Sequence, residues 1–331
     1  MSLTKLDIDR FITTLRTKSK EFNSISNIQL ASMLEETISN INEVAYFWAT
    51  ISSDNKGTTK TPAEGEEWVA GPYAAVLATQ YYRDSLINDA DLNESKYNEE
   101  ENSYKVFPNN MIERISFPFV NAKVYFNKTM SFNDINKYRG FSKRYEIEPS
   151  ITLVLGAGNY SSIPYLDVMY HLVTRRSVIL LKLNPVNEYL KPVFDKVFQN
   201  FIERGYIIVT TGNIDESKYM AQHPGVNHIH LTGSDKTYED IVYGRELSDS
   251  DRKLKQLPKF NSKPITSELG NVTPIIIHPG KWSTSDIKYQ ARKIVTGKLN
   301  NNGFNCISAQ VVVLPDGWGH TDTLIKYIKY Y

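Results

Sequence analysis

The sequence predicts a doubly wound α/β fold, in which helices cover both faces of a parallel β-sheet. Two short, almost wholly apolar runs, residues 151–155 and 178–183, are typical of strands that are buried on both sides. Apolar residues after them recur at helical spacing, most regularly from Leu190 to Ile202, ahead of Gly205 as a left-handed cap. Strands that alternate with helices in this way indicate parallel pairing through crossover helices.

The other elements are expected in a simple order along the chain. Apolar spacing predicts helices within residues 3–50 and 73–86, with polar loops at 53–66 and 88–103. The charged stretch 244–263 predicts a surface insertion. Further helices are expected at 163–174, 215–222, 236–242 and 285–299, and strands or short apolar segments at 206–210, 226–231, 266–269, 274–278 and 309–314.

Composition narrows the kind of partner. With 38 basic and 37 acidic residues in 331, no net charge attracts nucleic acid or an anionic membrane, so a small molecule is expected. No apolar run is long enough for a membrane span and residues 1–20 do not resemble a signal peptide, which favours a cytoplasmic location. Cys306 is the only cysteine and is expected as a free thiol. The histidines, His228 and His230 included, show no metal-ligand spacing, so no metal is expected.

Two strand ends are candidate anion sites. Gly156-Ala157-Gly158-Asn159 follows the first apolar strand, but Ser161 replaces the third glycine of a dinucleotide fingerprint, so a tight turn without a ligand is favoured on this motif alone. Thr232-Gly233-Ser234 precedes a predicted helix, where free amides and the helix dipole suit a phosphate. A simple helix cap by Ser234 is the commoner alternative.

Two residues are candidates for catalysis. Cys306 lies in the polar loop 300–306, where a thiol is accessible for attack on a carbonyl and asparagine amides can bind an oxyanion. Glu268 interrupts an apolar segment. Apolar surroundings would raise the pKa of its carboxyl group, which could then act as a general base near neutral pH. A buried, unreactive cysteine and a solvent-facing glutamate are the alternatives at these positions.

The order of these signals resembles the aldehyde dehydrogenase superfamily. The family pattern is a turn with an asparagine, a strand ending in lysine, a Thr-Gly-Ser motif, a Glu-Leu-Gly motif and then a cysteine. The matching residues here are Asn159, Lys182, Leu231-Thr232-Gly233-Ser234, Glu268-Leu269-Gly270 and Cys306, within roughly residues 150–316, and a weaker likeness begins at Trp68-Val69-Ala70-Gly71-Pro72.

The resemblance implies a Rossmann-like domain with NAD or NADP as cofactor. Cys306 would attack an aldehyde, while its own backbone N–H and the Asn159 amide hold the oxyanion. Glu268 would activate the water that hydrolyses the resulting thioester to a carboxylic acid. The residues implied to contact the cofactor are Lys182, Gly233, Ser234 and Gly270.

The resemblance also divides the chain into three expected regions. These are an N-terminal helical region (1–110), a dinucleotide-binding domain (111–264) and the start of an incomplete catalytic domain (265–331). Family members continue much further past the cysteine, whereas this chain has 25 residues after Cys306. We therefore expect a truncated enzyme of low activity, without the strand that family members use to oligomerise.

Three positions depart from the family pattern. Asn271 and Phe304 replace a usual glycine and a common glutamine, and Pro185 stands where NAD-preferring members often carry glutamate, so NAD or NADP stays open. Two other functions also stay open: a fatty acyl-CoA reductase that uses the same cysteine, and a non-catalytic interaction protein that keeps the fold.

Overall fold

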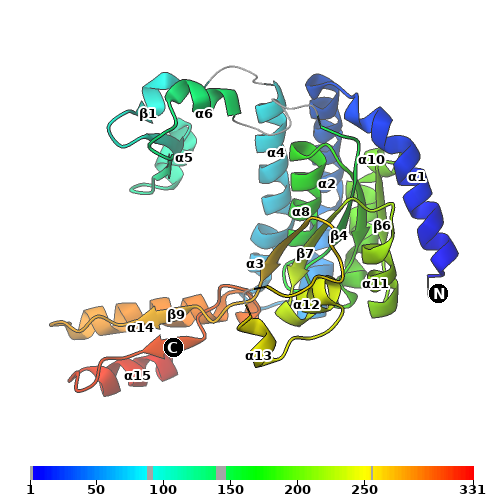
Figure 1. Ribbon diagram of the computed structural model, residues 1–331. Helices are drawn as coiled ribbons and strands as arrows, with labels where there is room; N and C mark the ends of the chain where they lie inside the picture. Colours follow the sequence, from blue (N-terminus) through cyan, green and yellow to red (C-terminus); the bar gives the residue numbers. More distant parts are fainter. Residues whose placement is uncertain (1–2, 88–91, 139–146, 255) are drawn as a thin grey trace.

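A parallel β-sheet forms the centre of the molecule. The computed structural model describes residues 3–87, 92–138, 147–254 and 256–331. The strands lie in the order β6-β5-β4-β7-β8, and every neighbouring pair is parallel (Figure 1). Their bounds are β4 (Ile151–Leu155), β5 (Val178–Lys182), β6 (Ile207–Thr210), β7 (His228–Gly233) and β8 (Ile265–Leu269). The direction of chain progression reverses between β4 and β7, which confirms the doubly wound α/β fold.

Helices cover both faces of this sheet. With right-handed crossovers, α8, α9 and α10 lie on one face and α11 and α12 on the other. The helix predicted at 190–202 is interrupted at Phe198, where the backbone leaves the helical region (φ −94°, ψ 12°) and the ring stacks on Tyr165 of α8 at 5.2 Å between centroids. The bounds are α8 (Ile163–Thr174), α9 (Lys191–Val197), α10 (Gln199–Glu203), α11 (Ile214–Gln222) and α12 (Asp235–Tyr243), with a short 3-10 helix at Pro185–Leu190.

The predicted N-terminal helices are confirmed as α1 (Lys5–Asn23) and α2 (Asn27–Lys56). α2 runs further than predicted and ends at Gly57, which adopts the left-handed conformation (φ 68°) that glycine accepts without steric cost. The start of the loop predicted at 53–66 is therefore helical. The helices α3 (Glu64–Trp68) and α4 (Ala74–Ile87) follow, joined by a π-helical turn at Val69–Tyr73.

A separate three-stranded antiparallel sheet was not predicted. It contains β1 (Tyr97–Asn98), β2 (Ser103–Phe107) and β3 (Ala122–Tyr125), with a 3-10 turn (Glu94–Lys96) and the helices α5 (Met111–Ser116) and α6 (Phe132–Tyr138) (Figure 1). Its strands are short, β2 is partly buried and β3 is exposed along its whole length, so they lack a clear alternating pattern. The boundary expected at 110/111 lies inside this unit, because β2 and β3 pair across it. Residues 88–91 of the loop predicted at 88–103 lie outside the described residues.

The C-terminal part forms a small lobe that projects from the main body (Figure 1). It contains β9 (Pro274–Ile276), α14 (Thr284–Leu299), β10 (Val311–Val313) and α15 (Thr321–Tyr330). The first three agree with the elements predicted there, whereas α15 was not predicted. β9 and β10 pair in parallel, and a second apolar core around Ile287 and Leu324 holds the lobe together. The stretch 244–263 carries only the short α13 (Asp249–Arg252) among its described residues and is mostly exposed, as a surface insertion should be.

None of the helices in the described ranges is both long enough and apolar enough to cross a bilayer.

Candidate active site

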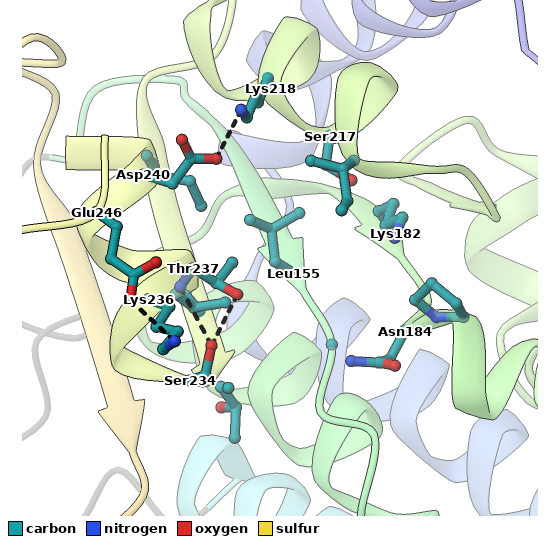
Figure 2. A pocket seen from close by; sticks show the side chains of 17 residues that line it. Leu155, Lys182, Asn184, Ser217, Lys218, Ser234, Lys236, Thr237, Asp240 and Glu246 are labelled. Carbon is teal, nitrogen blue, oxygen red and sulfur yellow. Dashed lines mark hydrogen bonds and ion pairs between the residues drawn. The ribbon is translucent and has the colours of Figure 1, made fainter. Parts of the chain in front are cut away.

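A pocket of about 510 Å³ opens at the carboxyl ends of the central strands (Figure 2). It is lined by the ends of β4, β5 and β7 and by side chains of α11 and α12. The strand register places Leu155, Lys182 and Leu231 side by side, on the face that α11 and α12 cover. The pocket thus lies where the chain direction reverses between β4 and β7, which is the place where doubly wound sheets bind ligands.

Lys182 brings an ammonium group to this pocket without a protein partner. The residue is only 6% exposed, and among the described residues nothing forms a hydrogen bond or ion pair with its Nζ, as Figure 2 also shows. Burial lowers the pKa of Lys182, because desolvation disfavours the cation. The carboxylates of Glu188 and Glu216 partly oppose this shift through space, but neither pairs with the ammonium, and a ligand with anionic or hydroxyl oxygens would offset the remaining cost of burial.

Gly233 and Ser234 line the same pocket, where α12 begins. The Ser234 hydroxyl accepts a hydrogen bond from the Thr237 N–H at 3.1 Å, so the expected helix cap is present. The cap and a phosphate site are compatible, because one side chain satisfies only one of the free amides at a helix start.

Two further lysines line the pocket and were not singled out in the sequence. Lys218 pairs with Asp240 at 2.8 Å and Lys236 with Glu246 at 2.9 Å (Figure 2). Their charges are therefore already matched by the protein, unlike that of Lys182. No local motif marks them, because the crossovers through α11 and α12 bring them to the site.

Cys306 is exposed, in the loop that follows α14. This excludes the alternative of a small buried residue and agrees with the expected accessible thiol. The Asn159 side chain donates a hydrogen bond to the carbonyl of Phe304 at 3.0 Å. The structure therefore brings the asparagine of the turn after β4 to the loop of the cysteine.

The asparagines of this loop hold its conformation. Asn301, Asn302 and Gly303 occupy the left-handed region in succession (φ 53°, 52° and 80°), which for an ordinary L-residue costs roughly 1 kcal/mol or more. The Asn301 amide donates to the Asn159 carbonyl at 3.1 Å, and the Asn305 amide to the Tyr160 hydroxyl at 3.1 Å. These two amides, expected near an oxyanion, are thus used to fix the turn.

Glu268 lies on β8, opposite Thr232 of β7 in the register. Thr232 points to α8, where its hydroxyl binds Asp167 at 2.9 Å, so Glu268 lies on the α8 face as well. Glu268 is exposed, so the apolar surroundings that we expected around it are absent. In the ranges described, no hydrogen bond joins Glu268 to Cys306 or Asn159. Gly270 is exposed just beyond the strand and does not line the pocket.

A buried polar chain connects α8 to this edge strand. His230 Nε2 lies 3.2 Å from Asp167 Oδ1, and His230 Nδ1 lies 2.8 Å from the Thr266 hydroxyl, two residues before Glu268. The His171 ring lies 5.0 Å from the His230 ring between centroids, tilted by 54°, and neither ring nitrogen of His171 has a hydrogen-bond partner in the described structure. Burial lowers the pKa of His171 to about 3, so the ring is neutral. This series of polar contacts orients β8, the strand that carries Glu268.

Comparison with known proteins identifies one family. Residues 173–328 match the family model described as the aldehyde dehydrogenase family. A search of curated protein sequences finds no match.

Solved structures of several dehydrogenases have a similar fold. Lactaldehyde dehydrogenase from Escherichia coli matches 100% of this chain and 56% of its own, at 15% identity and a TM-score of 0.65. The NADP-dependent glyceraldehyde-3-phosphate dehydrogenase from Bacillus halodurans, complexed with NADP, matches 99% and 57%, at 15% identity and 0.64. Aldehyde dehydrogenase C from Pseudomonas syringae, complexed with NAD+ and octanal, matches 99% and 54%, at 13% identity and 0.61. The chain therefore spans little more than half the length of these proteins, and at such identity the likeness is one of fold.

Proposed function

We propose that this chain is a member of the aldehyde dehydrogenase superfamily, whose family model matches residues 173–328, and that it carries the dinucleotide site and the nucleophile of an enzyme that oxidises an aldehyde to a carboxylic acid. The observation on which the proposal rests is a juxtaposition. The loop that carries an exposed lone thiol is bonded through its Phe304 carbonyl to the turn after β4, and the pocket at the switch point opens from the same strand end.

The pocket residues suit the adenosine and phosphate part of NAD or NADP. The unpartnered Lys182 ammonium can donate to ribose or phosphate oxygens, and the start of α12 at Gly233 and Ser234 offers amides to a phosphate. Pro185, which also lines the pocket, cannot accept a hydrogen bond from a ribose hydroxyl through its side chain. Nothing at that position therefore repels a phosphate on the ribose, and both cofactors fit.

The chain's own residues then divide the chemistry. Cys306 attacks the aldehyde carbon as a thiolate, and Asn159 together with the Cys306 backbone N–H supports the oxyanion of the thiohemiacetal. A nicotinamide dinucleotide held by Lys182, Gly233 and Ser234 would supply the hydride acceptor for this carbon. Glu268 takes a proton from the water that cleaves the remaining thioester, which releases the acid and restores the thiol. Gly270, directly after β8, belongs to the cofactor side in this assignment.

The assignment is tested with the purified chain in two steps. Titration with NAD and with NADP, followed by calorimetry, should give saturable binding; no binding of either would contradict the proposal. Addition of an aldehyde to the loaded chain should then produce NAD(P)H, at least as one burst per thiol, and the Cys306→Ser variant should bind the dinucleotide but give no burst.

The same assay separates the other open functions. Supplying an acyl-CoA with NADPH, and observing oxidation of the NADPH that requires Cys306, would indicate the reductase instead. Dinucleotide binding without either reaction would favour a non-catalytic role. We also propose a reducing, cytoplasmic setting, because a lone exposed thiol keeps its nucleophilicity only where oxidants are scarce.

A further inference from the structure

Charged side chains of the N-terminal region reach the loop that carries Cys306. Glu66 of α3 accepts a hydrogen bond from the backbone N–H of Asn301 at 2.7 Å. Lys56, the last residue of α2, donates to the Asn301 side-chain oxygen at 2.8 Å and to Glu67 at 2.7 Å. Two charged groups, more than two hundred residues away in sequence, therefore bind one asparagine of the loop, and Glu67 is joined to it through Lys56.

Burial makes this cluster costly to keep for packing alone. The side chains of Lys56 and Glu67 are 17% and 3% exposed, and Asn301 is 3% exposed. The second carboxylate oxygen of Glu67 is buried and has no hydrogen-bond partner within the described part of the chain. Apolar side chains of similar volume often stabilise a buried position at least as well as an ion pair does. We therefore expect these charges to have a role besides packing.

The cluster binds the loop at Asn301, where its backbone enters the left-handed region. The left-handed run from Asn301 to Gly303 begins at the residue that Glu66 and Lys56 bind, and it ends three positions before Cys306. Backbone in sparsely populated conformations persists only where the surroundings hold it firmly.

The turn after β4 holds the loop from its other side. Tyr160 donates its hydroxyl proton to the Asn300 side chain at 2.5 Å, and its ring lies 5.6 Å from Lys56 Nζ. The loop is thus held between the N-terminal helices and the turn that also carries Asn159.

We propose that Lys56, Glu66 and Glu67 form a charged brace that positions the Cys306 thiol. All three are positioning residues, because in the described structure each acts on Asn301 or on another member of the brace. The proposal rests on the proposed function in taking Cys306 as the reactive group. Its structural part, the dependence of the loop on Glu66 and Lys56, can be tested separately from catalysis.

The first test is the Glu66→Ala variant, with Glu64→Ala as the matched control. Glu64 lies on the same short helix, but its carboxylate accepts a hydrogen bond from the Lys60 N–H at 2.8 Å and makes none to the loop. Hydrogen–deuterium exchange in the peptide covering residues 300–306 should become about tenfold faster in Glu66→Ala, the expected effect of losing a hydrogen bond to a charged acceptor. It should stay unchanged in Glu64→Ala.

A second measurement uses the single cysteine, which makes chemical labelling unambiguous. The rate of Cys306 alkylation by iodoacetamide should change about threefold in Glu66→Ala, because the loosened loop no longer holds the exposed thiol, which donates to the Asn305 side-chain oxygen at 3.7 Å, in one position. The aldehyde-dependent burst should slow by a similar factor, while the dinucleotide dissociation constant stays that of the wild type. Unchanged exchange or unchanged alkylation would overturn the brace.

Lys56 provides the rescue experiment. Lys56→Met should loosen the loop further, and Lys56→Arg should restore slow exchange and normal alkylation, because a guanidinium can still bridge Glu67 and Asn301. An arginine variant as loose as the methionine variant, although equally folded, would contradict the proposal. If the wild type gives no aldehyde burst while exchange and alkylation still depend on Glu66, the proposed function fails and the brace stands.

Discussion

Replacing Lys182 with methionine should weaken dinucleotide binding without weakening the fold. Lys182 is 6% exposed, and among the described residues its ammonium has no hydrogen-bond or ion-pair partner, so no such bond to the protein is lost when it is removed. A hydrogen bond from a charged donor contributes about 1.5–3 kcal/mol. Because about 1.4 kcal/mol corresponds to a tenfold change in affinity, the dissociation constant should rise about 10- to 100-fold.

The effect on stability should have the opposite sign. The pKa of Lys182 is lowered on folding by burial, so at any pH below that pKa the folded chain holds a cation that the unfolded chain would hydrate. This cost is full below the folded pKa and falls to zero as the pH rises from there to the unfolded pKa of 10.5. Lys182→Met removes it, so at neutral pH the melting temperature without ligand should stay equal or rise.

The assay is calorimetric titration with NAD and with NADP, paired with thermal unfolding of the ligand-free chain. Lys218→Met is the control, because Lys218 lines the same pocket but is 40% exposed and already paired with Asp240 at 2.8 Å. An exposed pair is worth at most about 1 kcal/mol, so affinity in the control should change less than about fivefold. Wild-type affinity in Lys182→Met, or a clear loss of stability, would refute the reasoning.

Three other outcomes follow from single side chains. Cys306→Ser should abolish the aldehyde burst and all iodoacetamide labelling but leave the melting temperature unchanged, because the thiol is exposed; residual turnover would point to another nucleophile. Burial lowers the pKa of His171 from its ordinary value of 6.5 to about 3 in the folded chain. As the pH drops from about 6.5 toward 3, this residue should therefore lower the free energy of unfolding of the wild type by up to about 1.4 kcal/mol per pH unit. In denaturant titrations that part of the pH dependence should be missing from His171→Leu, and an identical profile would contradict a buried neutral ring. Tyr165→Phe, which removes a 2.5 Å hydrogen bond to Thr79, should cost about 1 kcal/mol in the same titrations, since Thr79 keeps its bond to the Ala75 carbonyl; a loss above about 3 kcal/mol would mean that the hydroxyl has a further role.

Local patterns in the sequence were sufficient to predict the doubly wound sheet. The runs at 151–155 and 178–183 are apolar on both faces, and this property can be recognised without knowing the neighbouring strands. The break of the helix at Phe198 was not predictable in the same way, because it accompanies packing against Tyr165 from another helix. The small sheet β1-β2-β3 was not predicted for a related reason. Its strands are short and partly or wholly exposed, so apolar and polar residues do not alternate clearly along them.

For the site, the sequence by itself determined which residue types are present and in what order, including the only thiol and the glycine and serine at the start of α12. Only the tertiary structure decided that Asn159 contacts the Cys306 loop, that Lys182 has no ion-pair partner among the described residues, and that Glu66 and Lys56 bind Asn301. The reason is physical. Propensity and periodicity act over a few residues, whereas hydrogen bonds and ion pairs between distant segments depend on which crossovers and turns bring those segments together.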